Sequence, residues 1–204
     1  RHRPHLVRRR RRVGNCAREK WRERAGEVGI AGAVTATHVI SEAGLPAKSR
    51  PATATDLPRI AVIYNEGIAE RSATFETTPR GVDDIADWLD GPFPCMVAEQ
   101  GGSIVGWIHA SRYRARECYA GIGDFSICLT RRARGQGIGD ALMGAFLPAC
   151  AEAGSWKLVA RIFPENAASR ALCVRHGFRE VGTYERHGQL DGLWRDVVIV
   201  EWLV

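Results

Sequence analysis

The 204-residue sequence has no C-x-x-C pair, and its cysteines and histidines show none of the spacings of a zinc site. It also has no run of eighteen apolar residues, and therefore no candidate membrane helix. Because a chain of this length does not need a disulfide framework, we expect its six cysteines to be free thiols in a reducing cytoplasm. We expect no metal site.

Acidic residues are scarce in the first fifty positions, which hold 4 of the 23 Asp and Glu but 13 of the 29 Lys and Arg. The net charge is therefore +9 in residues 1–50 and −3 in residues 51–204. The excess of positive charge is confined to the first fifty residues. The five arginines Arg8–Arg12 repel one another and stay solvated. We predict a basic, disordered or non-native extension over residues 1–49 and one domain over residues 50–204.

Two other interpretations of the extension stay open. A basic arm could bind nucleic acid or another anionic surface through its arginines. A transit peptide is disfavoured, because the segment is poor in serine and contains Glu19, Glu23 and Glu27.

Apolar periodicity and turn residues predict a mixed α/β domain with a largely antiparallel sheet. The helix beginning near Asp140 contains Pro148, which should kink or shorten it. Helices are expected at about 57–68, 82–89, 140–153 and 167–175, and strands at about 95–99, 104–110, 119–129, 157–163, 178–186 and 194–202.

A glycine-rich segment, Arg134-Gly135-Gln136-Gly137-Ile138-Gly139, lies between the long strand and the helix that follows it. Backbone N–H groups at a helix N-terminus attract an anion, so the segment predicts a pyrophosphate cradle. The alternative is a tight loop whose glycines have a structural function only. A P-loop is excluded because no Gly-Lys-Ser/Thr follows Gly139. A dinucleotide-binding fold is excluded because the third glycine is not at the required spacing and the preceding β-hairpin does not belong to a βαβ unit.

This segment resembles the motif R/Q-x-x-G-x-G/A of the GNAT superfamily of acetyl-CoA-dependent N-acetyltransferases, through Arg134, Gly137 and Gly139. Pro164-Glu165-Asn166 and the ending His176-Gly177-Phe178 fit the same family. The resemblance implies the GNAT fold, a mixed and mostly antiparallel central sheet flanked by helices.

Within the superfamily, residues 50–204 look like the phosphinothricin and arsinothricin N-acetyltransferases. Phe163-Pro164-Glu165-Asn166 and Leu190-Asp191-Gly192 are closer to the arsinothricin branch. Further similar segments are Ile63–Asn65, Ala73–Thr77, Ala110–Arg114, Ile162–Ser169 and His187–Val197.

The resemblance implies acetyl-CoA as co-substrate. The diphosphate would lie on residues Arg134, Gly135, Gln136, Gly137, Ile138 and Gly139. Backbone groups of Ile127 and Leu129 would pair with the pantetheine arm and polarise the thioester carbonyl. Asn166 would contact the arm, cap the next helix, or do both.

Acetylation of an amine requires loss of a proton before attack on the thioester. The family places a glutamate for this step at the centre of the long strand, where this sequence has Asp124, one methylene shorter and suited to relay through a water. The alternative is an aspartate satisfied by backbone donors. Cys173 occupies the position of the family's general acid, either as that acid or as a small buried filler, and His176 is a poor substitute.

The substrates of the family are glutamate analogues with an anionic tetrahedral head. By resemblance, Arg114, Arg116 and Tyr119 would hold that head, unless they belong to an exposed charged loop. Tyr64, Phe75 and Glu76 would form the other wall of the substrate site.

The predicted function is therefore N-acetylation of the α-amine of phosphinothricin, arsinothricin or methionine sulfoximine by direct transfer, which would confer resistance. Alternatives are acetylation of another small amine or of a protein N-terminus, or a nucleic-acid-binding module that senses acetyl-CoA. Resemblance further implies a homodimer.

Overall fold

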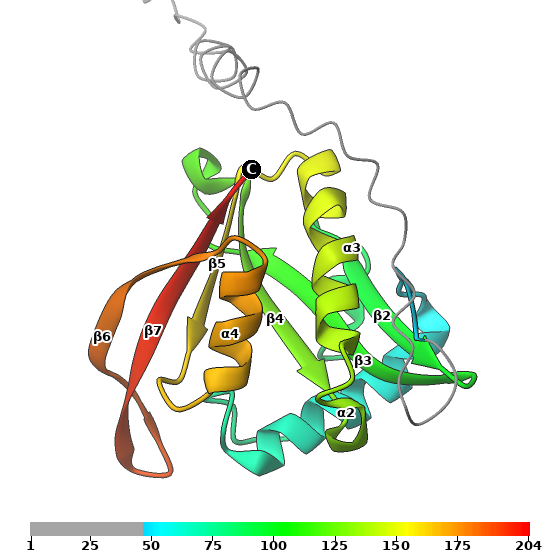
Figure 1. Cartoon of the computed structure of the whole chain (residues 1–204), viewed down its shortest axis with the longest axis horizontal. Coiled ribbons are helices and arrows are strands. Elements are labelled where there is room, and N and C mark those ends of the chain that lie inside the picture. Colours follow the sequence, from blue (N-terminus) through cyan, green and yellow to red (C-terminus); the bar gives the residue numbers. More distant parts are fainter. Residues whose placement is uncertain (1–46) are drawn as a thin grey trace, which may run out of the picture. The chain divides into compact units, whose positions relative to one another are not determined.

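The computed structural model describes residues 47–204, in which seven strands form one sheet of order β1-β2-β3-β4-β5-β7-β6 (Figure 1). Every neighbouring pair is antiparallel except β4 and β5. The strands are β1 (Lys48–Pro51), β2 (Cys95–Gln100), β3 (Ser103–Arg112), β4 (Ile122–Leu129), β5 (Lys157–Ile162), β6 (Arg179–Leu190) and β7 (Leu193–Leu203). The α-helices are α2 (Leu57–Glu70), α3 (Ile138–Glu152) and α4 (Ala167–Arg175).

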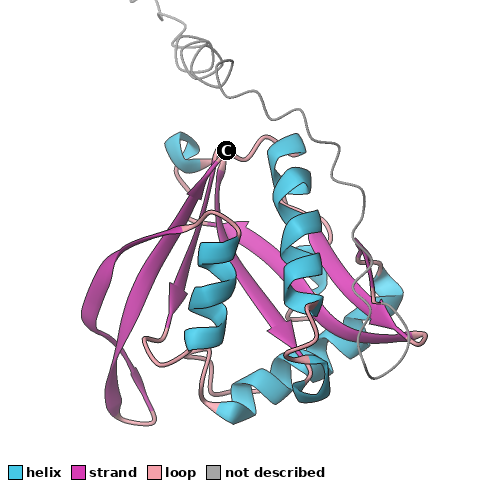
Figure 2. Ribbon diagram, in the orientation of Figure 1, coloured by secondary structure: helices cyan, strands magenta, loops and turns pink. Residues whose placement is uncertain are grey.

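Helices cover both faces of the sheet (Figure 2). The apolar residues of α3 and α4, among them Phe146 and Leu172, join the larger core cluster on one face. Ile60 and Ile63 of α2 pack with Trp107 of β3 in a second cluster on the other face. The predicted mixed α/β architecture with a mostly antiparallel sheet flanked by helices is confirmed. No helix within residues 47–204 has the length and apolar character needed to cross a membrane.

The parallel pair β4 and β5 is joined only at its beginning. Its register runs from Ile122 opposite Lys157 to Asp124 opposite Val159, and no pairing follows, although both strands continue. The two strands diverge beyond Asp124 (Figure 1). The sheet therefore opens on the side where β4 leads into the glycine-rich segment.

Several expectations need correction. Strand β1 was not predicted, because four residues are too few for a periodic signal, and it places Lys48 and Ser49 of the predicted extension in the sheet. The helix expected over 82–89 is only a 3₁₀ turn at Ala86–Trp88. Helix α3 runs through Pro148 to Glu152, so the proline does not shorten it. Residues 1–46 of the predicted extension lie outside the described residues.

The β6–β7 hairpin is also longer than predicted. Its turn is Asp191-Gly192, with φ values of 50° and 79°, a conformation that Asp-Gly sequences favour. The first strand was predicted to end at Arg186. The φ of Arg186 is positive and the register shifts there, but the strand continues beyond it to Leu190.

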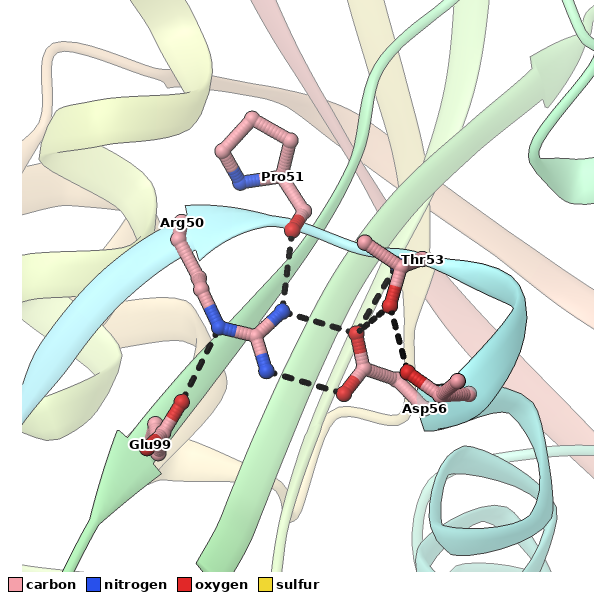
Figure 3. A network of polar contacts seen from close by, with 6 residues as sticks. Arg50, Pro51, Thr53, Asp56 and Glu99 are labelled. Carbon is pink, nitrogen blue, oxygen red and sulfur yellow. Dashed lines mark hydrogen bonds and ion pairs between the residues drawn. The ribbon is translucent and has the colours of Figure 1, made fainter. Parts of the chain in front are cut away.

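A network of charges ties β1 to the start of α2 (Figure 3). Arg50 donates to both oxygens of Asp56, at 2.7 and 2.9 Å, and to Glu99 of β2 at 3.0 Å. Thr53 donates its backbone N–H and its hydroxyl to the same carboxylate, at 2.8 and 2.9 Å. The Asp56 side chain is only 7% exposed, and Arg50 holds its pKa down to about 2.

Arg50→Ala is expected to lower the free energy of unfolding by about 2 kcal/mol at pH 7, because the Asp56 carboxylate then stays buried without its cation. The Asp56 pKa is depressed in the folded state, so its contribution is present above about pH 4 and is lost as the pH falls towards 2. Urea denaturation at pH 7 and pH 3 measures both effects.

The matched control is Arg170→Ala, which removes another two-bond Arg–carboxylate pair, with Glu180, in a more exposed place. Its expected cost is below about 1 kcal/mol. Equal losses for the two variants would contradict the role given to the buried carboxylate.

Candidate active site

The backbone of β4 presents alternate residues to its two neighbours. The N–H of Thr130, which follows the strand, donates to Val105 O of β3 at 2.9 Å, and the O of Ile122 accepts from Tyr113 N at 3.1 Å. Even-numbered residues therefore direct their N–H and C=O groups towards β3, and odd-numbered residues direct theirs towards β5.

Beyond Asp124 the odd-numbered residues of β4 have no strand opposite them. The backbone groups of Ile127 and Leu129 thus face the gap between β4 and β5. The Leu129 carbonyl is occupied by Arg134, whose Nε and Nη2 donate at 3.2 and 3.1 Å. An extended ligand could pair with the remaining groups as a strand would, which agrees with the function expected for Ile127 and Leu129.

The glycine-rich segment forms the entry to α3. Gly135 and Gly137 have φ values of 73° and 74°, a conformation that side chains other than glycine disfavour. Gly137 is the N-cap, and the first helical hydrogen bond runs from Ala141 N to Gly137 O at 3.0 Å. The N–H groups of residues 138–140 precede that bond and are available to an anion.

A cavity of about 650 Å³ lies between the glycine segment, the end of β4 and the start of α4. Seven of the nine residues predicted to bind acetyl-CoA line it: Ile127, Leu129, Arg134, Gly135, Gly137, Gly139 and Asn166. Gln136 and Ile138 do not. The Gln136 amide donates to Arg132 O at 2.6 Å, and the Ile138 side chain is buried in the core, so only their backbone groups could take part.

Arg134 is held in place before any ligand binds. Besides the Leu129 carbonyl, it contacts Glu70 at the end of α2 at 2.9 Å. Arg131 contacts the same carboxylate at 3.3 Å. The pKa of Glu70 is lowered, because these arginines outweigh its burial. The arginine of the motif is therefore oriented by an acid that the sequence analysis did not identify.

Asn166 is the N-cap of α4, and its Oδ1 accepts from Ser169 N at 3.1 Å. The predicted capping function is thus present. Because the residue also lines the cavity, its side-chain nitrogen is placed to contact a ligand as well.

Asp124 lies at the last paired position of β4, where the gap begins. Its side chain is 19% exposed and forms an ion pair with Arg161 of β5. Burial raises the pKa of Asp124, while the neighbouring guanidinium opposes the shift. The alternative of an aspartate satisfied by backbone donors does not hold, because its partner is a side chain.

Aromatic side chains line the face of the sheet on which α2 packs. Tyr64 contacts Trp88 and Trp107, with ring centroids 5.7 and 5.3 Å apart. His109 stacks on Trp88 at 4.5 Å and lies opposite Ser126, and burial lowers its pKa to about 4. His109 is therefore a neutral imidazole at pH 7.

Phe75 and Glu76, which were predicted to form a wall of the substrate site together with Tyr64, lie in the segment after α2. Phe75 packs edge-on against Phe163 at 5.0 Å and covers Gly188, where an added Cβ would lie 2.9 Å from its ring. Glu76 is paired with Arg80 at 2.7 Å. Phe75 thus joins this segment to the β6–β7 hairpin.

The three residues predicted to hold the anionic head lie in the loop between β3 and β4. Arg114 is over the Tyr113 ring at 5.2 Å, and Tyr119 packs against the same ring at 6.0 Å. Arg116 begins a 3₁₀ turn at Glu117–Tyr119. This loop enters β4 at the end opposite the glycine segment, with Asp124 between the two.

Cys173 does not line the cavity. It is 2% exposed in the larger core cluster, and burial raises its pKa to about 12. His176 contacts Asp140 at 3.2 Å. These surroundings favour the packing function for Cys173 and leave the acid unassigned.

Cys173→Ala is expected to leave kcat within about twofold of the wild type and to lower the free energy of unfolding by about 1 kcal/mol, since a buried sulfur is lost. Steady-state kinetics and urea denaturation measure the two effects. A tenfold loss of kcat with unchanged stability would show instead that the thiol takes part in the chemistry.

Sequence reasoning missed Glu70, Trp88, His109 and Arg161. None belongs to a motif, and each is placed by a strand register or by helix packing. Within residues 47–204, no three His, Cys, Asp or Glu side chains are grouped so as to hold a metal ion.

Comparison with known proteins agrees with this geometry. Residues 49–179 match the acetyltransferase (GNAT) domain family. A phosphinothricin N-acetyltransferase of Streptomyces coelicolor is 34% identical over 74% of this chain and 93% of its own. An L-methionine sulfoximine/L-methionine sulfone acetyltransferase of Pseudomonas paraeruginosa is 30% identical over 77% and 94%.

Among solved structures, the phosphinothricin acetyltransferase of Sinorhizobium meliloti in complex with acetyl-CoA is similar, with a TM-score of 0.73 and 31% identity over 78% of this chain and 88% of that one. The chain therefore belongs to the GNAT acetyltransferases, in the family of phosphinothricin and methionine sulfoximine acetyltransferases.

Proposed function

We propose that the protein transfers an acetyl group from acetyl-CoA directly to the α-amine of a toxic glutamate analogue, namely arsinothricin, phosphinothricin or methionine sulfoximine, and so confers resistance. The observation that carries the proposal is the position of Asp124. It lies where β4 leaves β5, between the glycine-lined cavity and the loop that contains Arg114 and Arg116.

The cavity fits an acyl-CoA in its chemistry. The N–H groups at the start of α3 suit a diphosphate, and the unpaired backbone of Ile127 and Leu129 suits an extended amide arm. Acetyl-CoA would supply the acetyl group there. The cavity would hold its reactive end near the free backbone groups of β4.

In this proposal Asp124 accepts a proton from the substrate ammonium, directly or through one water. The neutral nitrogen then forms the new bond to the acetyl carbon and the carbon–sulfur bond breaks. The nitrogen gives up its second proton, the leaving thiolate takes up one proton, and the products are the amide and the CoA thiol. Arg114, Arg116 and Tyr119 would bind the anionic head, because guanidinium groups match oxyanions in geometry.

A substrate panel tests the function. Release of CoA is measured with arsinothricin, phosphinothricin, methionine sulfoximine and a short peptide with a free N-terminus. We expect kcat/KM for at least one amino-acid analogue to exceed that for the peptide by more than about tenfold. Preference for the peptide would overturn the substrate assignment.

We also propose that residues 50–204, completed by the preceding residues of β1, are sufficient for catalysis. All of the proposed site residues lie in this part. The same panel run with a chain beginning at Ala47 checks it, and DNA binding that depends on salt and requires residues 1–46 would favour the alternative module.

Finally, we propose a homodimer. The β6–β7 hairpin ends the sheet at β6 and exposes apolar side chains, notably Tyr184, Leu193 and Trp194. Edge strands with exposed apolar residues are common sites of association. Sedimentation equilibrium measures the mass in solution.

A further inference from the structure

Asp124 and Arg161 lie on the same face of the sheet as α2. On β4, Phe125 belongs to the core cluster under α3, so its neighbour Asp124 points to the opposite face. On β5, Ala160 and Ile162 belong to that same cluster, which places Arg161 on the face of Asp124. The ion pair therefore bridges the two strands where their hydrogen bonding ends.

Arg161 has hydrogen-bonding capacity to spare. Its side chain is 42% exposed, and among the described residues its only hydrogen-bond partner is Asp124, through Nη2. One hydrogen of Nη2 is used in that bond, so the second Nη2 hydrogen, together with that of Nε or of Nη1, leaves one pair of parallel donors without a partner in residues 47–204. The other cation on this face of β5, Lys157, is paired with the buried Glu201. Arg161 is thus the available cation of β5 beside the proposed base.

The pair offers a negative carboxylate, Asp124, beside a positive guanidinium, Arg161. These two charges are complementary to the ammonium and the carboxylate of an α-amino acid. Such a substrate carries an ammonium and a carboxylate on one carbon, so both groups must be received close together. A guanidinium binds a carboxylate through two parallel N–H donors. The carboxylate of the pair is suited to the ammonium.

We propose that Arg161 binds the α-carboxylate of the substrate while Asp124 receives its α-amine, so that the pair selects α-amino acids over simple amines. This inference rests on the proposed function. It assigns to Arg161 a binding function that differs from the one proposed for the loop between β3 and β4. Arg114 and Arg116 bind the distal head, and Arg161 binds the carboxylate next to the reacting nitrogen.

Arg161→Leu tests the proposal against three substrates: phosphinothricin, its decarboxylated counterpart 3-aminopropyl(methyl)phosphinic acid, and methionine sulfone, which keeps the α-carboxylate but has an uncharged head. We expect kcat/KM to fall about 10- to 100-fold for phosphinothricin and for methionine sulfone, mainly through KM, because each loses a charge-assisted contact. The decarboxylated amine should lose less than about threefold.

Two other variants serve as controls. Arg161→Lys keeps the charge and should recover part of the preference for the amino acid. Arg170→Leu removes an arginine of α4 that is paired with Glu180 and does not line the cavity, and it should leave all three substrates unchanged.

The outcomes separate two failures. Equal losses for the amino acid and the amine would show that Arg161 only orients Asp124, and the inference would be overturned while the proposed function stood. A wild type that acetylates the decarboxylated amine as well as phosphinothricin would also overturn it. If the wild type acetylates neither of these two amino acids, nor arsinothricin or methionine sulfoximine, the proposed function fails together with the inference.

Discussion

Asp124→Asn is expected to reduce kcat about 100- to 10,000-fold with little change in KM for acetyl-CoA. The substitution keeps the size of the side chain but removes its ability to accept a proton from an ammonium group. The cavity should bind acetyl-CoA as before, because Asp124 is not among the residues that line it. Initial rates with each substrate varied in turn measure the two effects.

The pH dependence gives a second measurement. Asp124 acts as a base only when it is ionised, so kcat/KM should fall as the pH drops through its pKa. Burial raises that pKa, which places the fall at a higher pH than an exposed aspartate would give. The acid limb should be absent in the asparagine variant.

Asp124→Glu is the matched control, since it keeps the carboxylate and adds one methylene. It should retain at least about a tenth of the wild-type kcat. If the asparagine variant keeps more than about half of the activity, Asp124 is not the base and its pairing with Arg161 is structural.

Gly135→Val is expected to raise KM for acetyl-CoA about 10- to 100-fold. Gly135 has a φ of 73°, which costs other residues roughly 1–2 kcal/mol, and nothing lies within 4 Å of the position where a Cβ would be. Because Gly135 lines the cavity, strain or bulk added at this position should disturb the backbone N–H groups that face the ligand. Isothermal titration with CoA gives the change in affinity directly.

The chain offers a close control in Gly154, at the other end of α3. It has a φ of 86°, also with nothing within 4 Å of a Cβ, but it does not line the cavity. Gly154→Val should lose a similar amount of stability and bind CoA normally. Equal losses of affinity in the two variants would show that backbone strain, and not the cradle, explains the result.

The sequence predicted best the features that depend on neighbouring residues. The boundaries of α4 follow from Asn166, whose side chain caps the helix, and from Gly177, whose φ is 83° after its end. The glycine cradle was predictable for the same reason, since two positive φ values before a helix require glycine. Seven of the nine residues predicted to bind acetyl-CoA line one cavity.

Features that depend on distant residues escaped prediction. Strand β1 exists because it pairs with β2 and because Arg50 reaches Asp56 and Glu99. The apolar residues at 82–89 suit a helix, yet they form a 3₁₀ turn in which Trp88 packs on Trp107 and His109. In both cases tertiary contacts decide the local structure.

The sequence by itself determined the family and identified the glycine segment and the proposed base, because these lie in short motifs of fixed local spacing. Only the tertiary structure decided where β4 and β5 separate and which side chain stands beside Asp124. That pairing joins two residues 37 apart in the chain and depends on how β4 and β5 lie side by side, which no local pattern specifies.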